Sequence, residues 1–118
     1  MYDHIGLKVK DLDAAVGFYR AALAPLGHVL ASQDAANAGF GPPDAPALWL
    51  YRGAPGAKIH VAFRAADRRS VDRFHAAGLK AGGRDNGMPG LRTDYSPTYY
   101  AAFLLDPDGN NVEAVCVT

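Results

Sequence analysis

Two histidines and one glutamate are the residues of this 118-residue chain that could together perform metal chemistry. His4 and His60 each lie in a run of alternating apolar and polar residues, and Glu113 interrupts an otherwise apolar run. Two neutral imidazoles and one carboxylate can bind one side of a divalent ion and leave its other positions for water or substrate. These three side chains are therefore candidate metal ligands.

Each of these residues also has a purely structural interpretation. His4 taken alone is typical of a hydrogen-bonded structural histidine, and Glu113 could face solvent or pair with Arg92. The three residues are also too far apart in sequence to form a local metal-binding motif. The metal hypothesis depends on an internal repeat that relates the two histidines.

The second half of the chain repeats the first at a constant shift of 56 residues. At this shift His4 aligns with His60. Further pairs of the same kind are Asp11 with Asp67, Phe18 with Phe74, Leu23 with Leu79, and Gly27 with Gly83. The repeat predicts two copies of one β-α-β-β-β unit. With a few residues of extra shift for loop length, Trp49 aligns with Glu113.

Hydrophobic periodicity predicts the elements that position these residues. Residues 2–9, 28–33, 38–40, 47–51 and 58–64 have strand character, as do the two runs that flank a turn at residues 106–110. Asp11 and Asp67 are predicted N-caps of helices that end near residues 24 and 80. Residues 84–97 form a polar, turn-rich segment.

Alternation along the strands predicts which way the candidate ligands point. In each first strand the branched apolar residues can pack on the following helix, which leaves His4 and His60 on the opposite face. If the two sheets curl about a pseudo-twofold axis, these faces form one concavity. We then expect the two imidazoles and Glu113 to converge there, within one chain or across two.

Composition restricts the classes of function. Twelve basic and twelve acidic residues balance, so the sequence has no electrostatic footprint for nucleic acid or an anionic membrane. Its start has no secretory-leader pattern, and no apolar run is long enough to span a bilayer. The lone Cys116 excludes an internal disulfide and suits a reducing cytoplasm, so we expect a cytoplasmic protein. One domain over residues 1–118 is expected, with modules at about 1–54 and 55–118.

Three segments resemble the ligand-bearing segments of the vicinal oxygen chelate superfamily, which includes glyoxalase I, fosfomycin-resistance proteins, methylmalonyl-CoA epimerase and extradiol dioxygenases. The segments are residues 3–7, which precede Phe18 and Tyr19, then residues 58–62, and residues 106–113. The resemblance covers nearly the whole chain. It implies a divalent metal ion (Zn, Ni, Mn or Fe) held by His4, His60 and Glu113.

The chain departs from part of that family at Trp49. Glyoxalase I and the epimerase have a fourth protein ligand at the corresponding place, and an indole cannot bind a metal ion. The ligand set is therefore more similar to the three-residue set of the dioxygenases and fosfomycin-resistance enzymes, which argues against classical lactoylglutathione lyase activity. The bleomycin-binding branch lacks the ligands, so their presence here argues against a purely drug-binding role.

Two groups of residues are candidates for substrate binding. Trp49 and Tyr51 would share the concave face and form an aromatic wall, although they could equally fill the core. Residues 86–100 would form a loop or edge strand over the pocket mouth. There Arg92 would pair with a substrate anion, and Tyr95 or Tyr99 would donate a hydroxyl hydrogen. A tyrosine-rich dimer contact is the alternative for this segment.

The sequence thus predicts an α+β fold of two βαβββ modules, whose curled mixed sheets form a metal-containing concavity. A ferredoxin-like barrel would leave several predicted strands unused. The predicted function is a glyoxalase-like, metal-dependent lyase or isomerase that chelates vicinal oxygens of a small carbonyl or hydroxy substrate. An extradiol-type Fe(II) dioxygenase and a non-catalytic small-molecule binding or resistance protein are the alternatives. The expected partners are a small-molecule substrate and a second copy in a homodimer, and no residue is assigned as general base.

Overall fold

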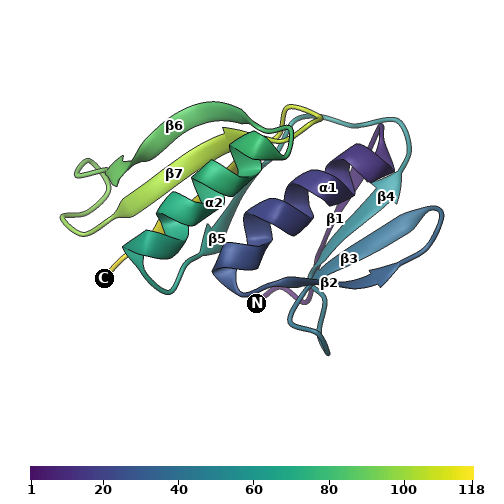
Figure 1. The fold of residues 1–118 in the computed structure, drawn as a ribbon, viewed down its shortest axis with the longest axis horizontal. Coiled ribbons are helices and arrows are strands. Elements are labelled where there is room, and N and C mark those ends of the chain that lie inside the picture. Colours follow the sequence, from purple (N-terminus) through teal and green to yellow (C-terminus); the bar gives the residue numbers. More distant parts are fainter.

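The computed structural model describes residues 1–118 and contains two four-stranded mixed sheets, each covered by one helix (Figure 1). Both sheets have the same strand order, in which the first strand of the module pairs in parallel with the fourth. Sheet A has the order β1 (Ile5–Val9), β4 (Leu48–Arg52), β3 (Asn37–Gly41), β2 (Val29–Gln33). Sheet B has the order β5 (His60–Arg64), β8 (Asn111–Cys116), β7 (Tyr100–Leu105), β6 (Arg84–Leu91). The predicted α+β fold of two βαβββ modules is confirmed.

Both helices begin at the predicted aspartates. The Asp11 side chain accepts from the Ala14 N–H before α1 (Leu12–Leu23), and Asp67 accepts from the Ser70 N–H before α2 (Arg68–Lys80). A short 3-10 turn, η1 (Ala24–Leu26), follows α1 and ends at Gly27, whose positive φ of 89° suits glycine. Each cap fixes where its helix starts relative to the preceding strand.

One hydrophobic core serves both modules. α1 and α2 pack against each other, and the helix-covered faces of both sheets contribute to a single cluster of 21 buried residues (Figure 1). Neither helix has the length and apolar character that a membrane span requires. Because both sheets turn one face toward this shared core, their opposite faces, called here the outer faces, point away from it.

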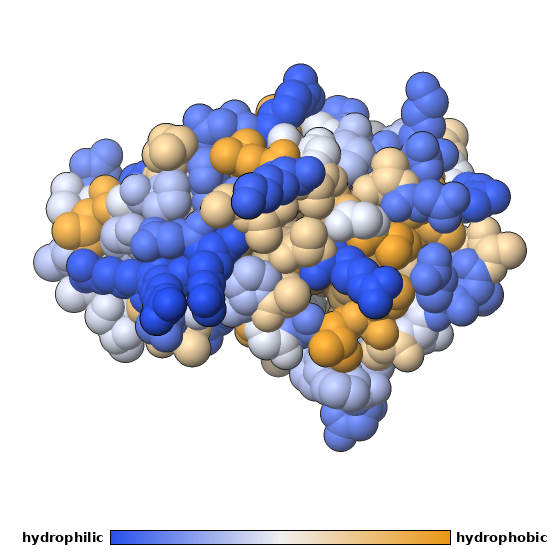
Figure 2. Space-filling view, in the orientation of Figure 1, coloured by the Kyte–Doolittle hydropathy of each residue, from blue (hydrophilic) through white to orange (hydrophobic).

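The exposed side of α2 is strongly hydrophilic. Figure 2 shows hydrophilic side chains gathered over this helix, where Arg68, Arg69, Asp72 and Arg73 are exposed. On its other side Val71 and Phe74 are fully buried in the core. The helix is therefore amphipathic, as its sequence periodicity predicts.

Strand register confirms the internal repeat in detail. In sheet A, Gly6 of β1 lies opposite Trp49 of β4, and in sheet B, Ala62 of β5 lies opposite Glu113 of β8. Gly6 and Ala62 are related by the same 56-residue shift as His4 and His60. Trp49 therefore occupies the position in module 1 that Glu113 occupies in module 2.

The segment expected to be turn-rich contains an edge strand. β6 pairs only with β7, and its register shifts between Asp85 and Gly87 and again between Gly87 and Gly90. A strand with Pro89 in it is tolerated at a sheet edge because its outer side needs no ladder partner. The prediction of a loop or edge strand for this segment is settled in favour of the strand.

A buried polar network at the turn between β7 and β8 joins the two modules. The Tyr19 hydroxyl of α1 donates to Asp106 Oδ2 at 2.5 Å, and Asp106 also accepts from the backbone N–H groups of Asp108 and Asn110. The Asn110 side chain donates to Asp106 and accepts from the Ile59 N–H. Burial, followed by the Asp106 charge, raises the pKa of Tyr19 well above its usual value. This network fixes the turn from which β8 and Glu113 begin.

Candidate functional site

The candidate site is centred on a buried carboxylate on the outer face of sheet B. Glu113 is only 2% exposed, and its two oxygens have separate partners. The Tyr99 hydroxyl donates to Oε1 at 2.5 Å, and His60 Nε2 lies 3.0 Å from Oε2. A solvent-facing Glu113 is therefore excluded. The alternative ion pair with Arg92 is not found either, because the two carboxylate oxygens contact Tyr99 and His60.

The orientation of the His60 ring decides which nitrogen is available for chemistry. Its Nδ1 lies 3.0 Å from the backbone carbonyl oxygen of Asn111. A carbonyl oxygen can only accept, so Nδ1 carries the hydrogen and a neutral ring presents the Nε2 lone pair toward Glu113. Two lone pairs would then face each other, and a cation between Nε2 and Oε2 relieves this repulsion. The cation can be a proton, which makes the ring an imidazolium, or a metal ion.

Tyr99 holds the other side of the same carboxylate. Its partial burial, together with its hydrogen bond to Glu113, raises the pKa of Tyr99 to about 12. At neutral pH the hydroxyl therefore remains a donor to Oε1. The Tyr95 ring packs edge-on against Tyr99, with centroids 5.0 Å apart, and is itself exposed. Of the two predicted hydroxyl donors, Tyr99 is thus committed to Glu113 and Tyr95 faces solvent.

Phe103 links the remaining side chains of the site. It lies opposite Glu113 in the β7–β8 ladder, and its ring stacks on His60 with centroids 6.3 Å apart. The Arg92 guanidinium lies 5.3 Å from the centre of the same ring. Phe103 was not among the predicted site residues. The signal was in the sequence, because a hairpin whose two strands pair evenly on either side of the turn at residues 106–110 places Phe103 opposite Glu113.

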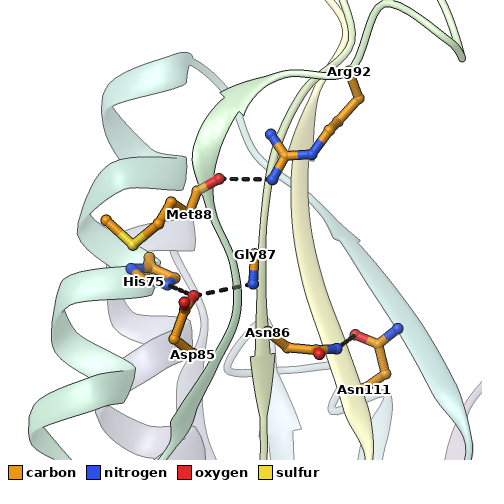
Figure 3. A network of polar contacts seen from close by, with 7 residues as sticks. All are labelled: His75, Asp85, Asn86, Gly87, Met88, Arg92 and Asn111. Atoms are coloured by element: carbon orange, nitrogen blue, oxygen red, sulfur yellow. Dashed lines mark hydrogen bonds and ion pairs between the residues drawn. The ribbon is translucent and has the colours of Figure 1, made fainter.

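Arg92 is bound by its own segment of the chain. Its Nη1 donates to the Gly90 carbonyl at 2.9 Å. Its Nη2 donates to the Met88 carbonyl at 2.7 Å (Figure 3). These bonds hold the irregular end of β6 in place beside the site. Each terminal nitrogen carries two hydrogens, so one on each remains for a ligand.

Two further contacts anchor β6 to its neighbours, as Figure 3 shows. The Asn86 amide donates to the Asn111 side chain, and His75 Nε2 of α2 lies 2.9 Å from Asp85 Oδ1. The Gly87 N–H and then His75 hold the pKa of Asp85 below its usual value. Asn111 was also missed, although its place two residues before Glu113 puts it on the same strand face. His75 is buried, and its contact with Asp85 ties α2 to β6.

The other predicted site residues lie on module 1. On the outer face of sheet A, Trp49 covers Gly39 and Tyr51 covers Gly6, so closely that a Cβ on either glycine would be 2.8 Å from the ring. Both rings are outside the buried core, which excludes the core-filling interpretation. His4 lies just before β1, and its Nδ1 is 2.6 Å from Asp3 Oδ1. This contact leaves His4 Nε2 free.

Within one chain the three predicted ligands do not come together. No group of three or more histidine, cysteine, aspartate or glutamate side chains is arranged to hold a metal ion. His60 and Glu113 form a pair on module 2, while His4 lies on module 1. The expected convergence of all three in one chain is thus not found, because both sheets turn their helix-covered faces inward to the shared core.

Comparisons with known proteins agree with this architecture. Residues 2–114 match the model of the Glyoxalase/Bleomycin resistance protein/Dioxygenase superfamily. A glyoxalase/bleomycin resistance protein from Albidiferax ferrireducens has a similar structure, with a TM-score of 0.84 and 30% identity over 98% of this chain and 97% of that one. A search of curated proteins finds no match.

Two other solved structures share the fold. A glyoxalase I variant from Zea mays has a TM-score of 0.71 and 25% identity over 95% of this chain and 45% of that one. A lactoylglutathione lyase from Agrobacterium tumefaciens has a TM-score of 0.70 and 21% identity over 98% of this chain and 92% of that one.

Duplicated βαβββ modules, with the candidate site on the outer faces of their sheets, define the architectural class of this protein. The chain belongs to the Glyoxalase/Bleomycin resistance protein/Dioxygenase superfamily.

Proposed function

We propose that the chain is a metal-dependent lyase or isomerase of the glyoxalase type, acting on a small carbonyl or hydroxy substrate with adjacent oxygens. The observation that carries this proposal is the 3.0 Å distance between His60 Nε2 and Glu113 Oε2. The other ring nitrogen of His60, Nδ1, is already paired with the Asn111 carbonyl. Two ligands about 2.1 Å from one ion, at right angles to each other, are about 3.0 Å apart. The pair therefore fits two adjacent positions on a divalent ion.

The third ligand in this proposal is His4 of a second copy of the chain. Both histidines have Nδ1 next to an oxygen acceptor, Asp3 for His4 and the Asn111 carbonyl for His60, so in each neutral ring Nε2 carries the lone pair that a metal ion would bind. Such second contacts orient metal-binding histidines. The outer faces of the two sheets point away from one core, so a homodimer that places sheet A of one copy over sheet B of the other would unite the set. Homodimerisation is part of the proposal.

A divalent ion held there would act as a Lewis acid toward the oxygens of the substrate. The chain's own residues have separate tasks. Tyr99 fixes the Glu113 carboxylate with a hydrogen that it retains at neutral pH. Arg92 has two N–H hydrogens left for an anionic group of the substrate, and Tyr95 can donate a hydroxyl hydrogen at the rim. In the dimer, Trp49 and Tyr51 of the opposite copy would form an aromatic wall.

Two histidines and one carboxylate also suit Fe(II) in an oxygenase, so an extradiol-type dioxygenase is the second candidate. In module 1 the place of Glu113 is taken by Trp49, which leaves no fourth ligand and argues against classical lactoylglutathione lyase activity. A binding protein without catalysis is the remaining candidate. Its predicted property is tight ligand binding by metal-free protein.

Calorimetric titration of chelator-treated protein with Zn²⁺ tests the proposal. Wild type should bind one ion per chain. Glu113→Gln and His60→Ala should each lower the affinity by about a hundredfold or more, since each removes a ligand. The matched control is Asp44→Asn, which changes an exposed carboxylate in the module 1 turn and should bind as wild type does.

Equal affinities in wild type and Glu113→Gln would rule the metal site out. With the site established, an isomerase screen of small carbonyl substrates and an anaerobic Fe(II) screen of catechols separate the two chemistries.

A further inference from the structure

Two hollows of nearly equal size lie where the modules meet, at repeat-related places. One, of about 190 Å³, is lined by the middle of β1, including Gly6 and Leu7, and by the chain before β5, including Lys58 and Ile59. The other, of about 200 Å³, is lined by residues 2–5 and by Ala62 and Phe63 of β5. The 56-residue shift maps these pairs of segments onto one another. The two hollows are therefore two copies of one structural feature.

Their linings differ in chemistry. The first hollow has Lys8, Lys58, Asp108 and Asn110 in its wall, so water is a good occupant. The second is walled mainly by apolar side chains that belong to the core or pack against it. They are Ile5, Leu23, Phe40, Leu48, Val61 and Phe63. An apolar hollow of this kind is poorly hydrated and gains free energy when an apolar molecule fills it.

One residue that lines the apolar hollow has a buried polar atom without a hydrogen-bond partner in the protein. His28, which follows η1, lines the hollow, and its Nδ1 is buried and unpaired. Its repeat counterpart is Arg84, which does not line the first hollow. A buried polar atom without a partner is destabilising, and a ligand that supplies the missing hydrogen bond removes that penalty.

We propose that this apolar hollow is a second small-molecule site, separate from the Glu113 site, that takes an uncharged ring compound with one hydroxyl or carbonyl oxygen. The volume limits the ligand to about one ring, since an apolar protein cavity of roughly 150 Å³ accommodates benzene. The apolar walls favour an uncharged ring, and the buried, unpaired His28 Nδ1 favours a hydrogen-bonding oxygen on it. A bound ring would also pack against residues 2–5, the segment that carries His4.

Phenol is the probe, and NMR of isotope-labelled protein in excess chelator is the measurement. Chelator separates this test from the metal proposal, because metal-free protein retains the hollow whether or not Glu113 binds an ion. Millimolar phenol should shift the amide signals of Leu23, Leu48 and Val61 in a saturable way. Signals of Lys8, Lys58 and Asp108 around the polar hollow should stay unchanged.

Two variants test the assignment, and both change residues that are not fully buried. His28→Leu removes the polar partner and should weaken phenol binding by about tenfold while leaving benzene binding intact. Ala47→Trp places a large ring at the exposed rim and should block both probes. Lys58→Ala, in the polar hollow, should have no effect on either probe.

Absence of saturable shifts in wild type would overturn the site. Shifts that persist unchanged in Ala47→Trp would place the probe elsewhere and overturn it as well. If His28→Leu lost affinity for phenol and for benzene equally, the hydrogen bond that defines the ligand class would be overturned.

Discussion

The two modules share one backbone plan and carry different chemistry. Trp49 and Glu113 occupy the same place in the register of their sheets, yet one is a half-exposed indole and the other a buried carboxylate. The turns before these strands differ in the same way. In module 2, Asp106 is buried and its carboxylate accepts four hydrogen bonds. In module 1, the turn has an exposed Asp44 instead. The two modules therefore share the scaffold, and only module 2 carries the carboxylate.

The comparison implies that the two outer faces complement each other. Sheet B has the acidic and basic groups, with Phe103 and Tyr99 packed beside them. Sheet A has the exposed rings of Trp49 and Tyr51 together with His4. The following experiments each change one module and test a difference between the two.

The largest effect is expected at the turn of module 2. Asp106→Ala leaves the Tyr19 hydroxyl, the Asn110 amide and two backbone N–H groups without their buried acceptor, which should lower the free energy of unfolding by about 3 kcal/mol. Asp44→Ala, in the turn of module 1, should change it by less than about 0.5 kcal/mol. Urea denaturation of both variants at pH 7 checks this. Similar losses in the two variants would show that the turns are energetically equivalent.

A smaller effect on stability is expected when the Tyr99 hydroxyl, which donates to Glu113 in module 2, is removed. Its folded pKa of about 12 lies above the unfolded value of about 10, so its contribution is complete below pH 10 and is lost as the pH rises through 12. Tyr99→Phe should lower the free energy of unfolding by about 1 kcal/mol at neutral pH. The difference from wild type should shrink above pH 10.

Tyrosinate absorbance provides an independent readout for the same residue. The spectrum of wild type minus that of Tyr99→Phe should show one ionisation near pH 12. In Glu113→Gln this ionisation should move to lower pH, since the carboxylate charge contributes to the raised pKa. No movement would mean that Glu113 does not act on the hydroxyl.

The smallest effect is spectroscopic and concerns sheet A. Trp49 is the sole tryptophan and is half-exposed on the outer face, so a partner that covers this face should shift its emission to shorter wavelength. The emission of wild type should therefore shift as the protein concentration rises. Ala62→Arg, at the equivalent of Gly6 on sheet B, should prevent the shift by placing a charge in the interface. A concentration-independent spectrum at concentrations where the protein sediments as a dimer would place the interface elsewhere.

Much of the fold could be predicted from local patterns. Alternating residues gave the strands, the N-caps gave the helix starts, and the repeat gave the common topology of both modules. β6 was harder because Gly87, Pro89 and Gly90 interrupt the alternation, and its position at the sheet edge tolerates them. The extent of this strand depends on pairing with β7, which no local pattern records.

The site could be predicted only in part. The sequence identified His60 and Glu113, whose pairing follows from the parallel register of β5 and β8. It did not reveal that Arg92 binds carbonyls of β6, since these contacts depend on the bulged geometry of the edge strand. The bond from Tyr99, just before β7, to Glu113 was missed as well. The separation of His4 from this pair follows from the packing of both helices into one core, a property of the whole chain.

Mixing two inactive variants tests the central claim, a metal site shared between two copies, most directly. His4→Ala and Glu113→Ala should each bind Co²⁺ weakly, as judged by its visible absorption. After co-refolding, a mixed dimer contains one complete set, with His4 from the Glu113→Ala chain and His60 and Glu113 from the His4→Ala chain. We expect one tight Co²⁺ site per mixed dimer to reappear. Mixed dimers that bind no more Co²⁺ than the separate variants would contradict it.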